Sequence, residues 1–239
     1  MKPICEVYRL GRIDYDAALA LQERLVAERS AGQTPDRLLL LEHPPTYTLG
    51  SSAQPEHLLL TPEEIARQGI QVVSVDRGGD ITYHGPGQLV AYPIIALPRE
   101  GEGLRTDFVG YLRRLERVLI GVLGDYGLRG KTIPGLTGVW VDTPTGEAKV
   151  AAIGVRINVR AVTKHGFALN VHPDMSHFAG IVPCGIHDKA VVSLASLLGQ
   201  PPSLDDVADR VSAHFADVFG CALQTGDVAE LEALPQSER

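Results

Sequence analysis

A continuous apolar run, LLLLEH at residues 38–43, constrains the fold of this chain more than any other segment. Four consecutive leucines offer no polar face, so the run does not fit a strand with one side in water. Such a run is typical of a strand that is buried on both faces. The chain is therefore expected to build its core around a sheet that is covered on both sides.

The other segments predict helices and hairpins around that strand. Apolar side chains recur at helical spacing from about residue 106 to 126, and Gly127 ends the pattern. Further helices are expected at residues 14–30, 61–69 and 203–219, where Asp14, a capping box at Thr61 and Ser203 mark the starts. Strands are expected near residues 5–10, 71–76, 88–97, 138–142, 148–159 and 164–171.

The order of these elements decides the fold class. Residues 138–142 and 148–159 flank the turn TPTG and predict a hairpin, and Pro93 suggests that its strand is an edge strand or contains a bulge. Hairpins next to helices do not form a regular β-α-β repeat. The prediction is a single α/β (α+β) domain with a mixed, largely antiparallel sheet flanked by helices.

Composition limits the classes of protein to consider. A length of 239 residues allows one large domain or two small ones, and a formal net charge of −7 argues against broad nucleic-acid binding. No apolar run approaches the ~20 residues that cross a bilayer, and the first residues lack the apolar core of a signal peptide. We expect a cytoplasmic protein with its main domain at residues 1–220 and a weakly ordered tail at residues 221–239.

The three cysteines suggest neither a disulfide framework nor a zinc ribbon. A small buried hydrophobe is the ordinary role of a free cysteine, and Cys5 and Cys221 fit it. Cys184 differs, because IVPCGI places its thiol between proline and glycine in a turn-forming setting. It could pair with His187 or, less simply, join a metal site with His172 and His177, but the spacing matches no standard zinc pattern.

Two glycine-containing segments lack the fingerprint of a nucleotide site. RGGDITYHGPGQ at residues 77–88 lets a ligand approach the backbone closely, but it has no GxGxxG between a strand and a helix. GDYGLRGKT at residues 124–132 has Asp125 where a phosphate loop needs glycine, and it follows a helix. These departures argue against a simple ATPase.

Five segments resemble, in this order, the lipoyl(octanoyl) transferase family: LLLEHPPTYTLG, RGGDITYHGPGQLVAYPII, KVAAIGVRI, HGFALNV and IVPCGI. The resemblance covers roughly residues 5–215. It implies the fold of the biotin and lipoate protein ligase catalytic domain, with residues 1–220 as an octanoyltransferase domain. It also implies transfer of an octanoyl or lipoyl group from acyl carrier protein to a lysine of lipoyl domains, as the first step of endogenous protein lipoylation. The acceptors would be 2-oxoacid dehydrogenases and the glycine cleavage H protein, with no cofactor, metal, nucleic acid or membrane involved.

The same resemblance implies the site residues. The match to IVPCGI places Cys184 at the family's acyl-thioester nucleophile, and the match to KVAAIG places Lys149 at the lysine that tunes it. The family's substrate-contacting segments match three stretches of this chain. They are Arg77, Gly78, Gly79, Asp80, Ile81, Thr82, Tyr83 and His84, then Ala152, Ile153 and Gly154, and finally Gly166, Phe167 and Ala168.

A thiol and an amine suffice for the implied chemistry. The thiolate is the attacking species, and an adjacent ammonium favours it. Lys149 could protonate the departing carrier thiol and then take the proton of the incoming amine, so the fold must bring it close to Cys184. Small residues at 152–154 and 166–168 suit an acyl slot, with Phe167 as an apolar wall. Since the donor is already a thioester, no nucleotide is required.

Other functions stay open at this point. An ATP-dependent ligase on the same fold needs no cysteine nucleophile, a non-catalytic acyl or carrier-protein binding module would not depend on Cys184, and a thioesterase would release free octanoate. Arg156, Arg160 and Lys164 are spaced four residues apart. On one strand they would share a face that could attract acidic partner proteins, whereas a turn at Ala161 would leave only the arginines together.

Overall fold

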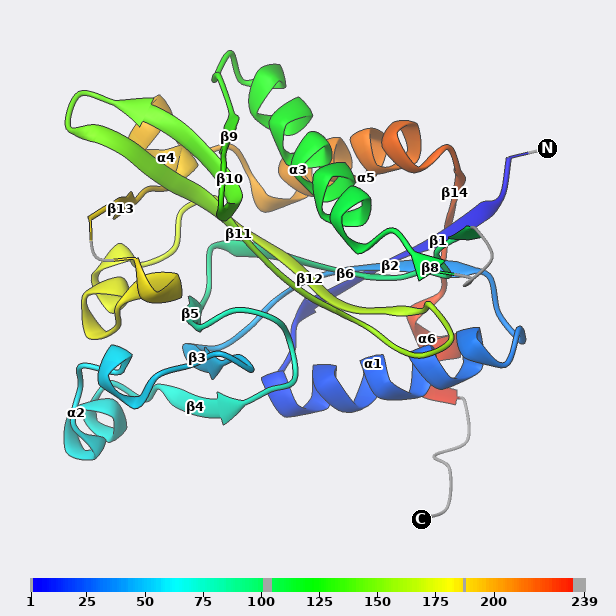
Figure 1. The fold of residues 1–239 in the computed structure, drawn as a ribbon, viewed down its shortest axis with the longest axis horizontal. Coiled ribbons are helices and arrows are strands. Elements are labelled where there is room, and N and C mark those ends of the chain that lie inside the picture. The colour runs from blue at the N-terminus through cyan, green and yellow to red at the C-terminus, as the bar shows by residue number, and fades with distance from the viewer. Residues whose placement is uncertain (1, 101–104, 187, 234–239) are drawn as a thin grey trace.

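The computed structural model describes residues 2–100, 105–186 and 188–233, and its largest feature is a nine-stranded mixed sheet (Figure 1). The strand order is β14-β1-β2-β6-β12-β11-β10-β9, with β13 paired to β11. Strands β14, β1 and β2 are parallel to one another, and the pairs from β2/β6 to β10/β9 are antiparallel. These strands are Ile4–Arg12 (β1), Asp36–Glu42 (β2), Gln88–Ile94 (β6), Lys131–Ile133 (β9), Leu136–Thr143 (β10), Gly146–Ile157 (β11), Thr163–Asn170 (β12), Ala190–Val191 (β13) and Ala222–Thr225 (β14).

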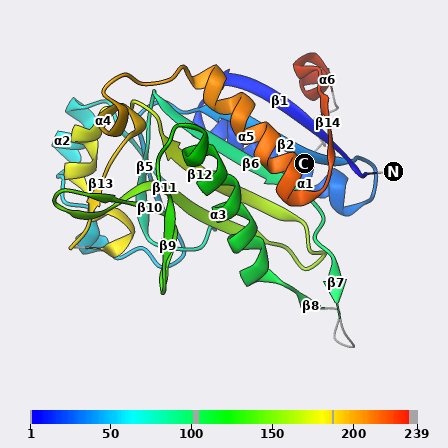
Figure 2. The same ribbon diagram turned by 90° about the horizontal axis from the view of Figure 1, so that it is seen from above.

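Helices cover both faces of this sheet (Figures 1 and 2). Helices α3 and α5 pack on one face, and α1 and α6 lie on the other. The helices are Tyr15–Ser30 (α1), Pro62–Arg67 (α2), Phe108–Asp125 (α3), Leu194–Leu198 (α4), Leu204–Phe219 (α5) and Val228–Ala233 (α6). Strand β2 confirms the predicted strand that is buried on both faces. Leu38 and Leu40 belong to the core under α3 and α5, and Leu39 and Leu41 belong to the core under α1.

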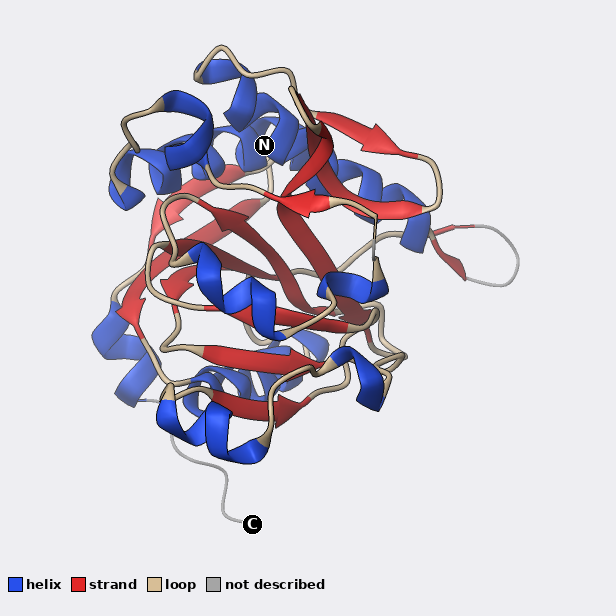
Figure 3. Ribbon diagram, turned by 90° about the vertical axis from the view of Figure 1, so that its left-hand side faces the viewer, coloured by secondary structure: helices blue, strands red, loops and turns tan. Residues whose placement is uncertain are grey.

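A smaller sheet extends the domain on the α1 side (Figure 3). It has the order β4-β3-β5, formed by Thr46–Leu49 (β3), Gln71–Ser74 (β4) and Ile81–His84 (β5). Three short 3₁₀ helices, Pro55–His57 (η1), Met175–Gly180 (η2) and Pro183–Gly185 (η3), lie beside it, and Arg99–Glu100 (β7) pairs with Arg105–Thr106 (β8) elsewhere. This arrangement brings the turn at Cys184 next to strand β5.

Local sequence signals set several helix ends as expected. The capping box at Thr61 is present, since its hydroxyl accepts from the Glu64 N–H and the Glu64 carboxylate accepts from the Thr61 N–H. The Ser203 hydroxyl caps α5 by accepting from the Asp206 N–H. Asp14 occupies the N-cap position of α1, but its side chain makes no capping hydrogen bond.

The prediction for Pro93 was wrong, because β6 lies in the middle of the sheet between β2 and β12. The pairing of β6 with β12 ends at Ala91, so the missing N–H of Pro93 removes no rung of that ladder. The Thr163 hydroxyl instead donates to the Pro93 carbonyl and accepts from the Ile95 N–H. Local side-chain bonds therefore accommodate the proline inside a central strand.

The segment after residue 220, expected to be a weakly ordered tail, contains β14 and α6. Strand β14 pairs with β1 in parallel, with Ile4 opposite Ala222. Leu231 of α6 is buried in the core on the α1 side of the sheet. Residues 234–239 lie outside the described residues.

Candidate active site

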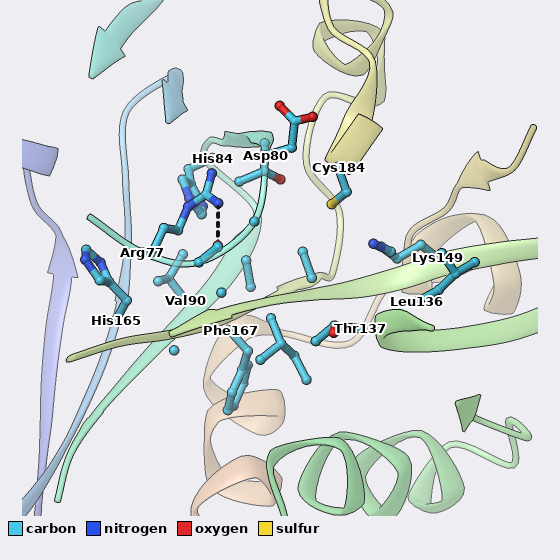
Figure 4. Close-up of a pocket in the computed structure, with 18 of the residues that line it drawn as sticks. Arg77, Asp80, His84, Val90, Leu136, Thr137, Lys149, His165, Phe167 and Cys184 are labelled. Atoms are coloured by element: carbon cyan, nitrogen blue, oxygen red, sulfur yellow. Dashed lines mark hydrogen bonds between the residues drawn. The ribbon is translucent and has the colours of Figure 1, made fainter. Parts of the chain in front are cut away.

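A cavity of about 250 Å³ lies between β5, the strands β11 and β12, and the turn at η3 (Figure 4). Both Cys184 and Lys149 line it. Every predicted substrate-contacting residue also lines it except Ile81 and Tyr83. Segments that are far apart in the sequence therefore meet at one place.

Strand geometry explains why Ile81 and Tyr83 do not line the cavity. Side chains alternate between the two faces of a strand, so Thr82 and His84 of β5 face the cavity while Ile81 and Tyr83 face the opposite side. There, Ile81 and Tyr83 are fully buried in a cluster with Tyr47. The structure therefore does not place the Ile81 and Tyr83 side chains at this cavity.

Lys149 reaches the cavity because β11 contains a bulge. Val139 pairs with Ala151 and Trp140 pairs with Lys149, so one extra residue, Val150, is inserted in β11. Regular alternation would place Lys149 on the same face as Ala151, which is buried in the core under α3 and α5. The bulge reverses this alternation, and Lys149 lines the cavity together with Ala152.

The Lys149 side chain is 5% exposed and has an unusual environment for a lysine. Among residues 2–100, 105–186 and 188–233, no carboxylate lies within salt-bridge distance of its Nζ atom. Its Nζ lies 4.8 Å from the centroid of the Trp140 ring. The stem of the side chain passes over Gly138, whose absent Cβ would stand 3.4 Å from the lysine Cε. A buried ammonium without a counter-ion is costly, so this site favours a negatively charged neighbour.

Cys184 sits in a strained turn at the edge of the cavity. Its φ is 57° and its ψ is 20°, in the left-handed region that side-chain-bearing residues rarely adopt, and Gly185 follows with φ 68°. The Pro183–Gly185 turn leaves the thiol partly exposed, unlike the buried Cys5 and Cys221. Figure 4 shows the Cys184 sulfur and the Lys149 Nζ directed into the same part of the cavity, one from the η3 turn and the other from β11.

Arg77 is a second buried cation at the cavity. Its side chain donates to the Thr48 hydroxyl at 2.8 and 3.2 Å, to the Thr48 carbonyl at 2.7 Å and to the Gly78 carbonyl at 3.1 Å. Burial lowers the pKa of Arg77 from its ordinary value. These neutral acceptors fix the guanidinium. Among the residues that the structure describes, no carboxylate is hydrogen-bonded to it, and its positive charge favours anionic species in the cavity.

His84 is fixed as a neutral ring. Its Nδ1 lies 2.8 Å from the Gln88 Oε1, which can only accept, so Nδ1 carries the proton. Burial lowers the pKa of His84 well below its ordinary value. Its Nε2 then has no proton, so the ring can form part of the cavity wall or accept a hydrogen bond through Nε2, but it has no free N–H to donate.

The floor of the cavity is formed by two paired strands with small residues. Ala152 pairs with Ala168, and Gly154 pairs with Gly166. A Cβ at Gly166 would stand 2.0 Å from the Ala91 carbonyl oxygen, so close strand packing there requires glycine. Phe167 also lines the cavity, but it belongs to the core cluster and Figure 4 shows its ring directed away from Cys184. The small side chains and the backbone, rather than the Phe167 ring, form this floor.

The basic residues Arg156 and Lys164, expected to attract partner proteins, do not lie on one continuous strand. The chain turns at Ala161, which has φ 63°, and Arg156 of β11 pairs across the hairpin with Lys164 of β12. Both contact Asp76, with Arg156 Nε at 3.2 Å and Lys164 Nζ at 2.9 Å from its oxygens. Partial burial acts in the opposite direction, but hydrogen bonds from His165 and Lys164 lower the pKa of Asp76 to about 2. Part of this charge is therefore neutralised within the protein.

The cavity also contains residues that the sequence did not single out. Tyr15, Val90, Leu136, Thr137 and Ile186 line it. Tyr15 comes from the start of α1 and Leu136 from the start of β10, so tertiary structure alone brings them together. Of these, Val90 and Ile186 had a sequence signal, since they belong to the RGGDITYHGPGQLVAYPII and IVPCGI segments.

Within the described ranges, no three His, Cys, Asp or Glu side chains are grouped so that they could hold a metal ion, and His187 lies outside those ranges. None of the helices that the structure describes is both long and apolar enough to cross a bilayer.

Comparison with known proteins places this site in a family. The model of the lipoyl protein ligase A/B catalytic domain matches residues 14–216. The chain belongs to this family. It is 54% identical to an octanoyltransferase of Chloroflexus aggregans over 213 residues, which is 89% of this chain and 94% of that protein. It is 50% identical to an octanoyltransferase of Solibacter usitatus over 93% of this chain and 96% of that protein.

Solved structures agree on the fold. A lipoate-protein ligase A bound with ATP matches with a TM-score of 0.76 at 15% identity, covering 97% of this chain and 91% of that one. A bipartite lipoate protein ligase from Thermoplasma acidophilum matches with a TM-score of 0.73 at 15% identity, covering 96% of this chain and 89% of that one. The predicted family and fold class are confirmed, and the relatives support the predicted acyltransferase activity, octanoyl transfer for protein lipoylation.

Proposed function

We propose that this chain transfers an octanoyl group from acyl carrier protein to a lysine of a lipoyl domain, through an acyl-thioester on Cys184. One observation carries the proposal. A partly exposed thiol and a buried ammonium, which has no carboxylate partner among the described residues, line the same cavity and point into the same part of it. Such a pair favours a thiolate with a proton held beside it.

In the first half-reaction, the Cys184 thiolate attacks the carbonyl carbon of the octanoyl thioester. A carbon–sulfur bond to Cys184 forms and the carbon–sulfur bond to the carrier breaks. The Lys149 ammonium gives its proton to the departing carrier thiolate, which leaves as a thiol. Lys149 is then neutral beside the acyl-enzyme, so the charge that favoured the thiolate is no longer present.

In the second half-reaction, the lysine of the lipoyl domain attacks the acyl-enzyme. Its amine is mostly protonated at neutral pH, so it first loses one proton to solvent, and the neutral amine attacks. As the carbon–nitrogen bond forms, the nitrogen must lose a second proton to a base. Neutral Lys149 is that base. The carbon–sulfur bond to Cys184 breaks, the amide leaves, and the thiolate–ammonium pair is restored. Thioester exchange is near balanced and amide formation is downhill, so no nucleotide is needed.

The cavity supplies binding energy for the acyl chain. Each buried methylene contributes ~0.8 kcal/mol, so an octanoyl chain lying along Ala152 and Ala168 gains several kcal/mol before binding costs. Excluding water from that slot also protects the acyl-enzyme from hydrolysis. The small cavity-facing residues of β11 and β12 leave room for an unbranched chain.

The partners and location follow from the same function. The donor is octanoyl-acyl carrier protein, and the acceptors are the lipoyl domains of 2-oxoacid dehydrogenases and the glycine cleavage H protein. The protein works in the cytoplasm without nucleic acid, membrane or metal. Residues 1–220 are proposed as the octanoyltransferase domain.

A transfer assay tests this function against its alternatives. The protein is incubated with octanoyl-acyl carrier protein and a lipoyl domain without ATP, and both the modified domain and free octanoate are quantified. We expect the lipoyl domain to be modified without ATP, with little free octanoate released. Cys184→Ala should no longer modify the lipoyl domain. Modification that requires ATP and uses free octanoate as substrate would indicate a ligase. Free octanoate as the main product would indicate a thioesterase. Full transfer activity in Cys184→Ala would rule out the acyl-enzyme.

A further inference from the structure

A histidine–aspartate pair lies directly against the turn that presents Cys184. The His57 Nδ1 donates to the Asp80 Oδ2 at 2.5 Å, and the two side chains are 15% and 11% exposed. The other carboxylate oxygen of Asp80 accepts from the Ile81 N–H at 2.6 Å and from the Gln54 N–H at 3.3 Å. Asp80 is thus fixed by β5, and it fixes the His57 ring in turn.

The main chain around His57 holds the other side of the same turn. The His57 carbonyl accepts from the Val182 N–H at 2.8 Å, two residues before the thiol. Leu58 forms a β-bridge with Ile181, which continues this pairing back toward η2. One residue, His57, therefore contacts the turn through its backbone and supports Asp80 through its side chain.

The pair also touches the residue that follows the thiol. A Cβ placed on Gly185 would stand 2.8 Å from the Asp80 Oδ2 and 3.1 Å from the His57 Cε1. The pair consequently packs against the Gly185 main chain at a distance that admits no side chain. This contact matters because Cys184 and Gly185 have consecutive left-handed φ values of 57° and 68°. A non-glycine residue in that region persists only where its surroundings hold it.

We infer that His57 and Asp80 are positioning residues, which keep the Cys184 turn in its left-handed conformation so that the sulfur faces Lys149. The inference rests on the proposed function. It adds His57 to the site and gives a positioning role to Asp80, which also lines the cavity. The Asp80 carboxylate points away from Lys149 (Figure 4), so the pair acts through the turn rather than on the reacting atoms. His57 does not line the main cavity.

The test uses the substrate-free, full-length protein. Iodoacetamide alkylation of Cys184 is followed at neutral pH by mass spectrometry of the peptide that contains it. Cys5 and Cys221 are 1% and 6% exposed and serve as internal references. Since Lys149 favours the reactive thiolate, Lys149→Met is expected to slow alkylation of Cys184 about tenfold or more.

If the pair positions the sulfur, His57→Ala slows alkylation by about the same factor as Lys149→Met, because misplacement of about 1 Å is enough to break such a contact. The double variant His57→Ala/Lys149→Met is then no slower than Lys149→Met alone, because both changes remove one interaction. In the transfer assay, His57→Ala lowers kcat and leaves KM for octanoyl-acyl carrier protein unchanged.

Three variants separate positioning from a general loss of structure. His57→Asn keeps an N–H donor near the position of Nδ1 and is expected to restore most of the rate, and Asp80→Asn keeps the acceptor for Ile81 while weakening the bond to His57. His214→Ala is the matched control, since His214 Nε2 lies 3.0 Å from the Asp125 Oδ2 in a similar pair away from the cavity. It should leave alkylation unchanged.

The outcomes distinguish this inference from the function on which it rests. Slow alkylation of Lys149→Met with wild-type rates in both His57→Ala and Asp80→Asn would overturn the positioning role alone. Rate losses that multiply in the double variant would overturn it as well. Wild-type alkylation in Lys149→Met would contradict the Cys184–Lys149 pair itself, and the positioning role would fall with it.

Discussion

Replacing Gly138 by alanine would displace Lys149 without changing its chemistry. Gly138 lies in β10 with φ 123°, and an added Cβ would stand 2.7 Å from the Ala151 carbonyl oxygen in the bulged part of β11. An ordinary contact of this kind begins at 3.4 Å, so the two strands must separate by about 0.7 Å. Because Lys149 is held on the same bulge, its ammonium moves relative to the Cys184 sulfur.

Gly146→Ala provides a matched control in the same hairpin. Gly146 has φ 121°, nearly the value of Gly138, but a Cβ there would meet nothing within 4 Å. Both variants incur the backbone strain of ~1–3 kcal/mol that a non-glycine residue has in this region. For a chain of this length, each kcal/mol lowers Tm by about 2–4 °C, so both variants should melt several degrees lower.

Activity is expected to separate the two variants. A displacement approaching 1 Å in a reacting pair can cost ~100-fold, so Gly138→Ala should lose about tenfold or more in kcat. Gly146→Ala should keep its kcat at temperatures below its Tm. Single-turnover transfer from octanoyl-acyl carrier protein, measured beside thermal melting, checks both effects. Equal kcat values in the two variants would refute the argument that the bulge positions Lys149.

Three other predictions concern the Cys184–Lys149 pair, the N-terminal cap of α2 and the pH dependence of stability. Lys149→Met should lower the rate of acyl-enzyme formation by ~10²–10⁴-fold, the range for losing a general acid–base, whereas the exposed Lys131→Met should not. Thr61→Ala removes a capping box and should cost ~1 kcal/mol of unfolding free energy in denaturant titration, with kcat unchanged. Burial lowers the pKa of His43 to about 4, so the fold favours its neutral form and loses stability as pH falls from about 6.5 toward 4, by ~2 kcal/mol at pH 5. The Tm difference between pH 7 and pH 5 should shrink in His43→Gln, and an unchanged difference would show that His43, which accepts from Tyr92, is not responsible.

Much of the fold could be predicted because its signals are local. The leucine run of β2, the apolar stripe of α3 and the caps at Thr61 and Ser203 each depend on side chains within a few residues. The segments that form the cavity could also be predicted, since their motifs resemble those of a known family. Alternation along β5 then removed Ile81 and Tyr83 from the site, which a segment-by-segment match does not resolve.

The orientation of Lys149 could not be predicted from its own segment. Period-two alternation along β11 directs it into the core, and only the extra residue at Val150, visible through the register against β10, reverses its direction. His57 was missed for a related reason. It gives no motif of its own, and its contacts with Val182 and Asp80 arise because η1 packs against the Cys184 turn. Such contacts between distant segments exist only in the folded chain.

The most direct test of the acyl-enzyme is the intact mass of the protein after brief incubation with octanoyl-acyl carrier protein. The account predicts a gain of one octanoyl group on the peptide that contains Cys184, its loss when a lipoyl domain is added, and no gain in Cys184→Ala. An unmodified protein that still transfers octanoate, or an octanoyl group found on another residue, would contradict it.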